Sequence, residues 1–139
     1  MIGHYNKQIQ QLIIWTKENL TPSAGGNVSN AYEFILVLGD KVLHSNCQFT
    51  KNVITTRGWN NEFSDVHKAV MNPQVCRWMI ETFTQPDEII LDPFMGVGTT
   101  AYCAKQLKRK FVGFELSKEY IEIANKRIEN SFKLKASPK

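Results

Sequence analysis

The stretch Asp92-Pro93-Phe94-Met95-Gly96-Val97-Gly98-Thr99-Thr100 decides the fold of this chain. It follows the apolar run 88–91 and precedes residues with helical spacing, which predicts a short strand, a glycine turn and a helix. Glycine has no Cβ, so the backbone at Gly96 and Gly98 can adopt a positive φ and a ligand can approach it closely. We therefore expect a ligand-binding turn, the plainer alternative being a turn that only reverses the chain.

The next strand-like run, 110–114, ends at Glu115, where a βαβ unit presents an acidic side chain to a ribose diol. Gly96-x-Gly98-x-x-Ala101 satisfies the dinucleotide pattern, but Asp92 directly before the turn would repel a pyrophosphate. A carboxylate suits a ligand with an ammonium and a sulfonium. S-adenosylmethionine has both, and its ribose would meet Glu115. A nicotinamide-dependent oxidoreductase stays a minor alternative, because no substrate domain is recognisable.

Composition limits the class of protein. The chain has 139 residues, 42% of them hydrophobic, which favours one domain with a core over disorder. The sequence has neither an apolar run of about 20 residues nor a basic-then-apolar N-terminal signal, so we expect a soluble, cytoplasmic protein without membrane contact. A net charge of +4 and a pI of about 9.0 favour a nucleic-acid partner, although the basic cluster at 105–110 can equally be a solvated helix face.

Cys47, Cys76 and Cys103 lack metal-site spacing, so we expect buried free thiols rather than a disulfide framework or a metal site.

Local patterns predict further elements. Apolar runs at 11–16 and 33–38 indicate buried strands. Asn72 before Pro73 predicts the N-cap and first residue of a helix that ends before 85–87.

The end of the chain reads as one more helix. Ser117 is placed to cap this last helix, with Leu116 and Ile121 spaced as a hydrophobic staple.

With these residues in place, the chain resembles the C-terminal half of the amino-methylating DNA methyltransferases, the bacterial and phage N6-adenine and N4-cytosine enzymes of restriction-modification type. The resemblance rests on D-P-F-x-G-x-G-T-T at 92–100 and F-x-G-x-E-L-x-x-x-Y at 111–120, together with Trp15-x-Lys17, the run 32–38 and the segment from His67 to Pro73. It implies an α/β, Rossmann-like fold of the S-adenosylmethionine-dependent methyltransferases, with the cofactor turn C-terminal to the catalytic loop.

The resemblance also implies roles for individual side chains. Residues matching the cofactor motifs are Asp92, Phe94, Gly96, Gly98, Thr99, Glu115 and His67. Phe94 would pack beside the cofactor, Asp92 and the two glycines would hold its methionine end, and Glu115 would hold the ribose. His67 lies in the segment expected to close over the methionine moiety. From the residues alone, Asp92 could instead cap a helix, Glu115 could cap the helix at Ser117, and His67 could be an ordinary loop histidine.

The family pattern divides the chain into parts. We expect an N-terminal strand pair in 1–40, a short target-recognition region in 41–65, a cofactor-binding helix and βαβ unit in 66–132, and a frayed tail in 133–139. Lys51, Arg57 and Trp59 fall in the region where such enzymes contact DNA, although Trp59 is about as well explained as a core residue.

The family's methyl-transfer site, an Asp/Asn/Ser-Pro-Pro-aromatic tetrapeptide, has no match, because the sequence contains no Pro-Pro. In the family that segment would precede Met1, together with two strands in the middle of the sheet. We therefore expect an incomplete sheet, no catalytic residue in this chain, and no activity of the chain alone. Unpaired central edges favour pairing between molecules, most simply in a homodimer, or with a complementing polypeptide that carries the catalytic segment.

We predict an S-adenosylmethionine-dependent DNA methyltransferase, or its cofactor-binding fragment, that methylates an exocyclic amino group of a flipped base when complemented. Adenine N6 is the favoured target, with cytosine or an RNA substrate left open. The alternative is a non-catalytic remnant or assembly module derived from such an enzyme.

Overall fold

The chain forms two units, Met1–Asn60 and Asn61–Lys139, and each is described by itself. A computed structural model describes residues 9–18, 31–39, 51–57, 63, 65–67 and 69–130. Cys47, Trp59 and the predicted tail at 133–139 lie outside these residues.

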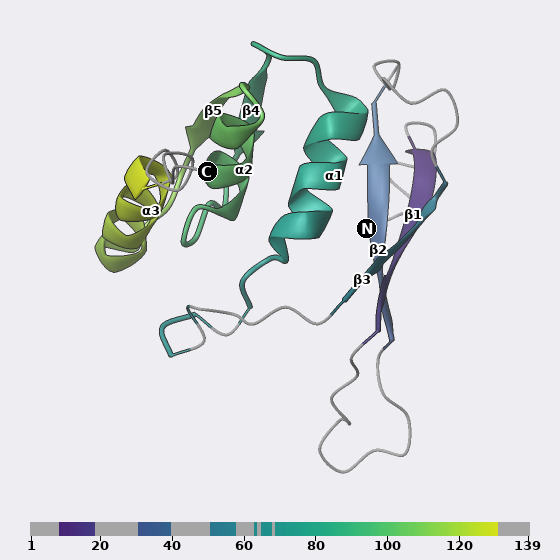
Figure 1. Cartoon of the computed structure of the whole chain (residues 1–139), viewed down its shortest axis with the longest axis horizontal. Helices are drawn as coiled ribbons and strands as arrows, with labels where there is room; N and C mark the ends of the chain where they lie inside the picture. Colours follow the sequence, from purple (N-terminus) through teal and green to yellow (C-terminus); the bar gives the residue numbers. More distant parts are fainter. Residues whose placement is uncertain are drawn as a thin grey trace, which may run out of the picture. The chain divides into compact units, whose positions relative to one another are not determined.

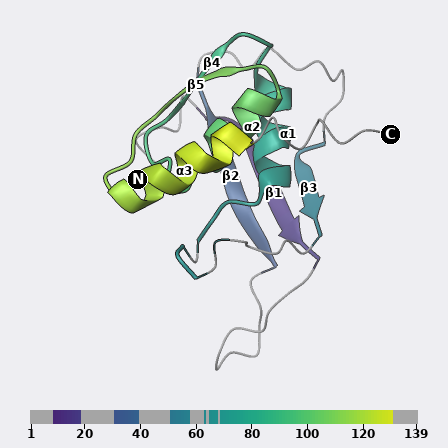
Figure 2. The same ribbon diagram turned by 60° about the vertical axis from the view of Figure 1, so that its left-hand side comes forward.

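The first unit holds a three-stranded sheet in the order β2-β1-β3, with the strands side by side in Figure 2. The central strand β1 (Ile9–Lys17) pairs antiparallel with β2 (Tyr32–Leu38) and parallel with β3 (Val53–Thr56). The two strands predicted near the N-terminus are thereby confirmed, but the prediction that they are buried is wrong: only Ile13 of β1 is buried, and no residue of β2 is. An antiparallel pair can leave apolar side chains exposed on one of its faces. The third strand comes from the region 41–65, and its alternation of exposed and buried residues shows that one of its sides is buried.

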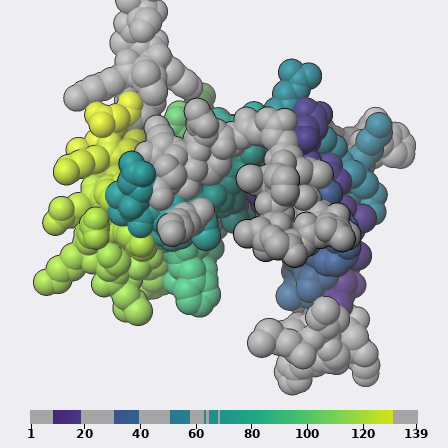
Figure 3. Space-filling view, turned by 90° about the horizontal axis from the view of Figure 1, so that it is seen from below, coloured from purple at the N-terminus to yellow at the C-terminus, as the bar shows by residue number. Residues whose placement is uncertain are grey.

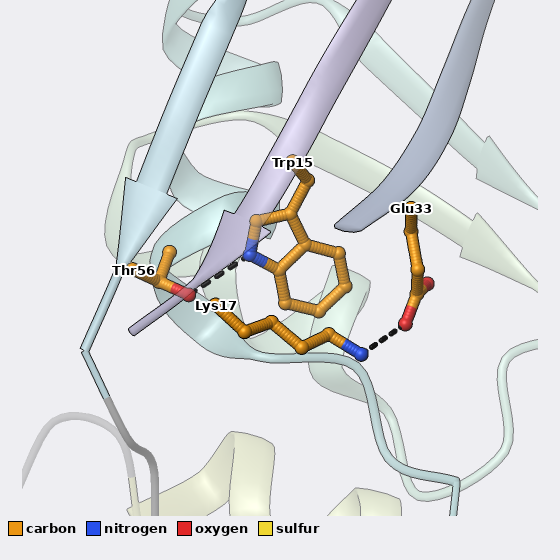
Figure 4. A network of polar contacts seen from close by, with 4 residues as sticks. All are labelled: Trp15, Lys17, Glu33 and Thr56. Atoms are coloured by element: carbon orange, nitrogen blue, oxygen red, sulfur yellow. Dashed lines mark hydrogen bonds and ion pairs between the residues drawn. The ribbon is translucent and has the colours of Figure 1, made fainter. Parts of the chain in front are cut away.

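Polar side chains tie β1 to both neighbouring strands at one end of this sheet (Figure 4). The Trp15 indole N–H donates to the Thr56 hydroxyl over 2.8 Å, while Lys17 forms an ion pair with Glu33 of β2. The Lys17 ammonium also lies 4.7 Å from the centre of the Trp15 ring. Such cross-strand contacts stabilise the pairing, so Trp15 and Lys17 have a structural role in the sheet.

The second unit contains the predicted βαβ arrangement (Figure 1). Strands β4 (Ile89–Asp92) and β5 (Lys110–Gly113) are parallel and are connected through helix α2 (Thr99–Gln106). Helix α1 (Pro73–Phe83) precedes β4, and helix α3 (Lys118–Asn130) follows β5. Because α2 contacts both strands and both other helices, it is the centre of the unit. Helix α3 forms part of its outer surface, yellow to yellow-green in Figure 3.

The core of the second unit lies between α1, α2 and one face of the strand pair. Its buried members are Cys76, Ile80, Cys103 and Ala104, with Ile90 and Phe111 of the strands packed against them. The opposite face of the strands is exposed: the exposed fraction of the residue is 68% for Ile89, 62% for Leu91 and 46% for Val112. Parallel sheets ordinarily have both faces covered, so this apolar face is unusual.

Two of the three cysteines are described, and both Cys76 and Cys103 are buried free thiols, as predicted. A hydrogen bond with Cys103 and burial raise the pKa of the Cys76 thiol, so Cys76 stays protonated and unreactive at neutral pH.

No helix in the described part of the chain is long and apolar enough to cross a membrane.

The expected start of α1 is confirmed. The buried Asn72 side chain accepts a hydrogen bond from the Gln74 backbone N–H over 2.8 Å, and Pro73 is the first helical residue.

Asn72→Ala, which removes this cap, is expected to lower the free energy of unfolding by about 1 kcal/mol in urea titrations. Gln74→Ala in the same helical turn keeps the donor N–H and is the control, expected to stay within about 0.5 kcal/mol of the wild type. Equal losses in both variants would contradict the capping role.

The predicted hydrophobic staple at the start of α3 is wrong. Leu116 is 101% exposed and therefore does not pack against Ile121. The backbone N–H groups of Leu116 and Ser117 both donate to the Glu115 carboxylate, which holds the chain in a turn where Leu116 points outward. Ser117 caps α3 as expected, its hydroxyl accepting from the Tyr120 N–H over 3.4 Å.

Candidate functional site

The glycine turn between β4 and α2 has the backbone conformation that its sequence predicts. Gly96 has φ = 53° and Gly98 has φ = 79°, both in the left-handed region that favours glycine. The Gly98 N–H donates to the Met95 carbonyl over 2.9 Å, and Gly98 is the N-cap of α2. Gly98 has no side chain, so no side-chain hydrogen bond caps the positive N-terminal end of α2.

The turn also lies against α3. A Cβ built on Gly98 would come within 2.8 Å of the Ala124 Cβ, closer than real side chains approach. A Cβ on Gly96 would meet only the His67 ring, at 3.6 Å from Nε2 and 3.9 Å from Cδ2, which are ordinary contacts. Gly98 is thus required both by its φ angle and by the packing of α3, whereas Gly96 is required by φ alone.

Glu115 connects the turn to the segment after β5. One carboxylate oxygen, Oε2, accepts from the Gly96 N–H over 2.9 Å, and the other accepts from the N–H groups of Leu116 and Ser117 over 2.8 Å each. The bond from Ser117 and those from Gly96 and Leu116 favour the charged form and hold the pKa of Glu115 below its usual value. Glu115 is therefore a carboxylate at neutral pH, fixed at the glycine turn and also bound to the residue that caps α3.

His67 lies at the same turn. Its ring centre is 4.9 Å from that of Tyr120, and its Nδ1 accepts from the Ala69 N–H over 3.1 Å. The Tyr120 hydroxyl in turn donates to the Val66 carbonyl over 3.3 Å. Helix α3 thus holds the segment around His67 beside Gly96.

The other predicted residues of this site differ in their exposure. The Asp92 carboxylate accepts from the Phe94 N–H over 3.0 Å, so this bond lies within the turn and does not cap α2. Phe94 is 90% exposed. Thr99 is buried, and its hydroxyl accepts from Arg127 over 2.9 Å. The structure therefore gathers the predicted cofactor residues around one turn, with Thr99 on its inner side.

The motif at 111–120 includes Tyr120, but the sequence did not predict a role in this site for the face of α3 that carries it. Tyr120, Ala124 and Arg127 all touch the turn or the segment around His67. Their spacing of four and three residues places them on one helical face, which is the signal that could have pointed to them.

The residues predicted to contact DNA belong to the first unit. Lys51 is exposed, and Arg57, with a side chain 88% exposed, lies 3.5 Å from a Glu18 carboxylate oxygen. Trp59 is outside the described residues.

Comparison with known proteins agrees with this geometry. The DNA methylase family of the N6/N4 type matches residues 1–126. The type II methyltransferase M.HinfI of Haemophilus influenzae is 29% identical over 142 residues, covering 84% of this chain and 38% of M.HinfI. The type II methyltransferase M2.LlaDCHI of Lactococcus lactis subsp. cremoris is 53% identical over 69 residues, covering 50% of this chain and 26% of that protein. The chain thus spans less than half the length of these relatives.

Solved structures show the same fold. The complex of M1.HpyAVI with S-adenosylmethionine matches with a TM-score of 0.70 and 29% identity, over 86% of this chain and 62% of that one. The cytosine-N4-specific PvuII DNA methyltransferase matches with a TM-score of 0.69 over 86% of this chain and 51% of its own, at 18% identity, which shows the fold alone. The predicted Rossmann-like α/β fold is confirmed, and the chain belongs to the N6/N4 family of DNA methylases.

Proposed function

We propose that this chain binds S-adenosylmethionine at the glycine turn and is the cofactor-binding part of an amino-methylating DNA methyltransferase. One observation carries the proposal: the hydrogen bond of 2.9 Å between Glu115 and the Gly96 N–H joins a carboxylate and a glycine turn in one site. These are the two groups that a sulfonium nucleoside needs, one for its ribose hydroxyls and one for close approach of its amino-acid end.

The residues present fit this cofactor. Glu115 is ionised, and its Oε2, which accepts one N–H, keeps a lone pair for a ribose hydroxyl. Asp92 supplies negative charge where the ligand carries an ammonium. The exposed Phe94 ring offers an apolar surface beside the turn. His67 would close the site from the segment before α1. When bound, S-adenosylmethionine supplies the methyl group on its sulfonium.

The proposed acceptor is an exocyclic amino group of a flipped DNA base, with adenine N6 favoured by the resemblance. Transfer depends on holding that amino group in line with the methyl group. In the family this is the task of the Pro-Pro tetrapeptide, which the sequence lacks. Lys51, Arg57 and the remainder of 41–65, including Trp59, are the proposed DNA contacts, supported by the net charge of +4.

We propose further that a second polypeptide carrying the tetrapeptide completes the domain. The exposed apolar face of β4 and β5 supports this. A second copy of this chain could cover the same face. It would bring no tetrapeptide, so a homodimer alone is expected to be inactive.

Calorimetric titration with S-adenosylmethionine and with NAD tests the cofactor. We expect uptake of the methyl donor alone. Binding of NAD instead would support the alternative of a nicotinamide-dependent oxidoreductase. Binding of neither compound would support the alternative of a non-catalytic remnant.

Incubation with DNA and labelled methyl donor tests the need for a partner. We expect no label in DNA with this chain alone, and transfer once it is co-expressed with the segment of M.HinfI that lies outside the match. Strong labelling by the chain alone would disprove the proposed division of roles.

A further inference from the structure

Arg127 of α3 contacts several segments of the second unit at once. Its guanidinium carbon lies 4.9 Å from the ring centre of Phe63 and 5.0 Å from that of Tyr102 in α2. Its Nη1 donates to the Thr99 hydroxyl over 2.9 Å and to the Val97 carbonyl over 3.4 Å. One side chain thus joins the glycine turn, the first part of α2 and the loop before α1.

The same face of α3 contacts these segments along its length. Tyr120 holds the loop at Val66 and His67, and Ala124 lies against Gly98. Arg127, three residues further on, reaches the far side of the turn at Val97 and Thr99. The glycine turn therefore packs along one face of α3, and the contact at the C-terminal end of that face is made by the charged side chain of Arg127.

We infer that Arg127 is a positioning residue: it fixes Thr99 and the Val97 carbonyl, and with that carbonyl the plane of the Val97–Gly98 peptide, so that the glycine turn has its conformation before a ligand arrives. The identity of that ligand as S-adenosylmethionine rests on the proposed function. Hydrogen bonds from a charged donor are stronger than neutral ones, and aromatic contact adds to them. A lysine keeps the charge but loses the planar fork, so it can replace Arg127 only in part.

Hydrogen exchange in the full chain without ligand tests this inference. In Arg127→Met we expect exchange of the backbone amides of Gly96, Gly98 and Tyr102 to be about tenfold faster, from the loss of a charge-assisted hydrogen bond. Arg127→Lys should be intermediate. The matched control is Lys126→Met, which removes the same charge from an exposed neighbour on the same helix and should leave exchange unchanged.

Exchange elsewhere in the unit separates positioning from general stability. Faster exchange confined to the turn and the start of α2 supports the inference, whereas an equal rise at β5 and α3, or none at the turn, overturns it. Should Arg127→Met fail to fold, Thr99→Val removes the hydroxyl acceptor with little change of shape. It must also raise exchange at the turn if the inference is correct.

Titration with S-adenosylmethionine is the second measurement. We expect about tenfold weaker binding in Arg127→Met, partial recovery in Arg127→Lys and no change in Lys126→Met. If the wild-type chain takes up no S-adenosylmethionine, the proposed function fails. A local response of the turn amides in the same variants would still support the role of Arg127.

Discussion

Gly98→Ala is expected to destabilise the second unit by about 2–5 kcal/mol, because the backbone strain and the packing clash add. Gly98 has φ = 79°, and an added Cβ would lie 2.8 Å from the Ala124 Cβ and 3.2 Å from its Cα. Since α3 is held against the turn by Tyr120 and Arg127, it cannot move away without breaking those contacts. Urea unfolding measures the loss, and calorimetry should show that binding of S-adenosylmethionine is abolished.

Gly96→Ala is the matched control within the same turn. Its φ of 53° carries a similar backbone penalty of about 1–2 kcal/mol, but its added Cβ would meet only His67 at 3.6 Å. The difference between the two variants therefore measures the packing of α3 against the turn. If both variants lose the same stability, that packing contributes nothing.

A double-mutant cycle gives an independent check of the same contact. Ala124→Gly removes the nearest atom and costs about 1 kcal/mol of helix stability by itself. In the background of Gly98→Ala it should recover part of the loss, although the Ala124 Cα remains close. Strictly additive losses would show that Ala124 is not the obstacle.

The local elements of this unit could be predicted from the sequence, because local rules govern them. The glycines of the turn and the Asn72 cap follow from residues that are near one another in the chain, and the parallel strands follow from the βαβ pattern. The prediction of a staple at Leu116 failed because the Glu115 carboxylate determines the local backbone by accepting from the Leu116 N–H. The same carboxylate also accepts from the N–H of Gly96, nineteen residues away.

Contacts between distant segments could not be predicted in this way. Arg127 reaches Thr99 and Val97 across 28 and 30 residues, and no local pattern specifies that an arginine on this helix turns inward. The pairing of β3 with β1 likewise depends on the course of the chain between them. The predicted cofactor residues could be grouped from the sequence because a motif records their joint geometry, whereas beyond Tyr120 the helix that supports them has only a general amphipathic pattern.

Glu115→Ala is expected to weaken binding of S-adenosylmethionine about a hundredfold, since it removes the acceptor for the ribose hydroxyls and the bond that holds the Gly96 N–H. Glu115→Gln should be nearly as damaging. An amide has one oxygen, so its NH2 group must face either the Gly96 N–H or the N–H groups of Leu116 and Ser117, and donor would meet donor. Glu119→Ala, which removes an exposed carboxylate from the first turn of α3, is the control and should bind normally.

The pH dependence of binding distinguishes this role of Glu115 from general acid unfolding. Hydrogen bonds hold the pKa of Glu115 below its usual value of 4.5, so the stabilisation from the carboxylate is complete above that value and is lost as the pH falls through the lowered pKa. Affinity should therefore stay constant from neutral pH down to about pH 5 and decline only below the usual pKa of a glutamate. In Glu115→Gln, which cannot titrate, this decline should be absent, and acid unfolding should lack the part that Glu115 contributes in the wild type. An equal decline in both proteins would mean that another carboxylate governs the site, because only titration of Glu115 itself is abolished by that substitution.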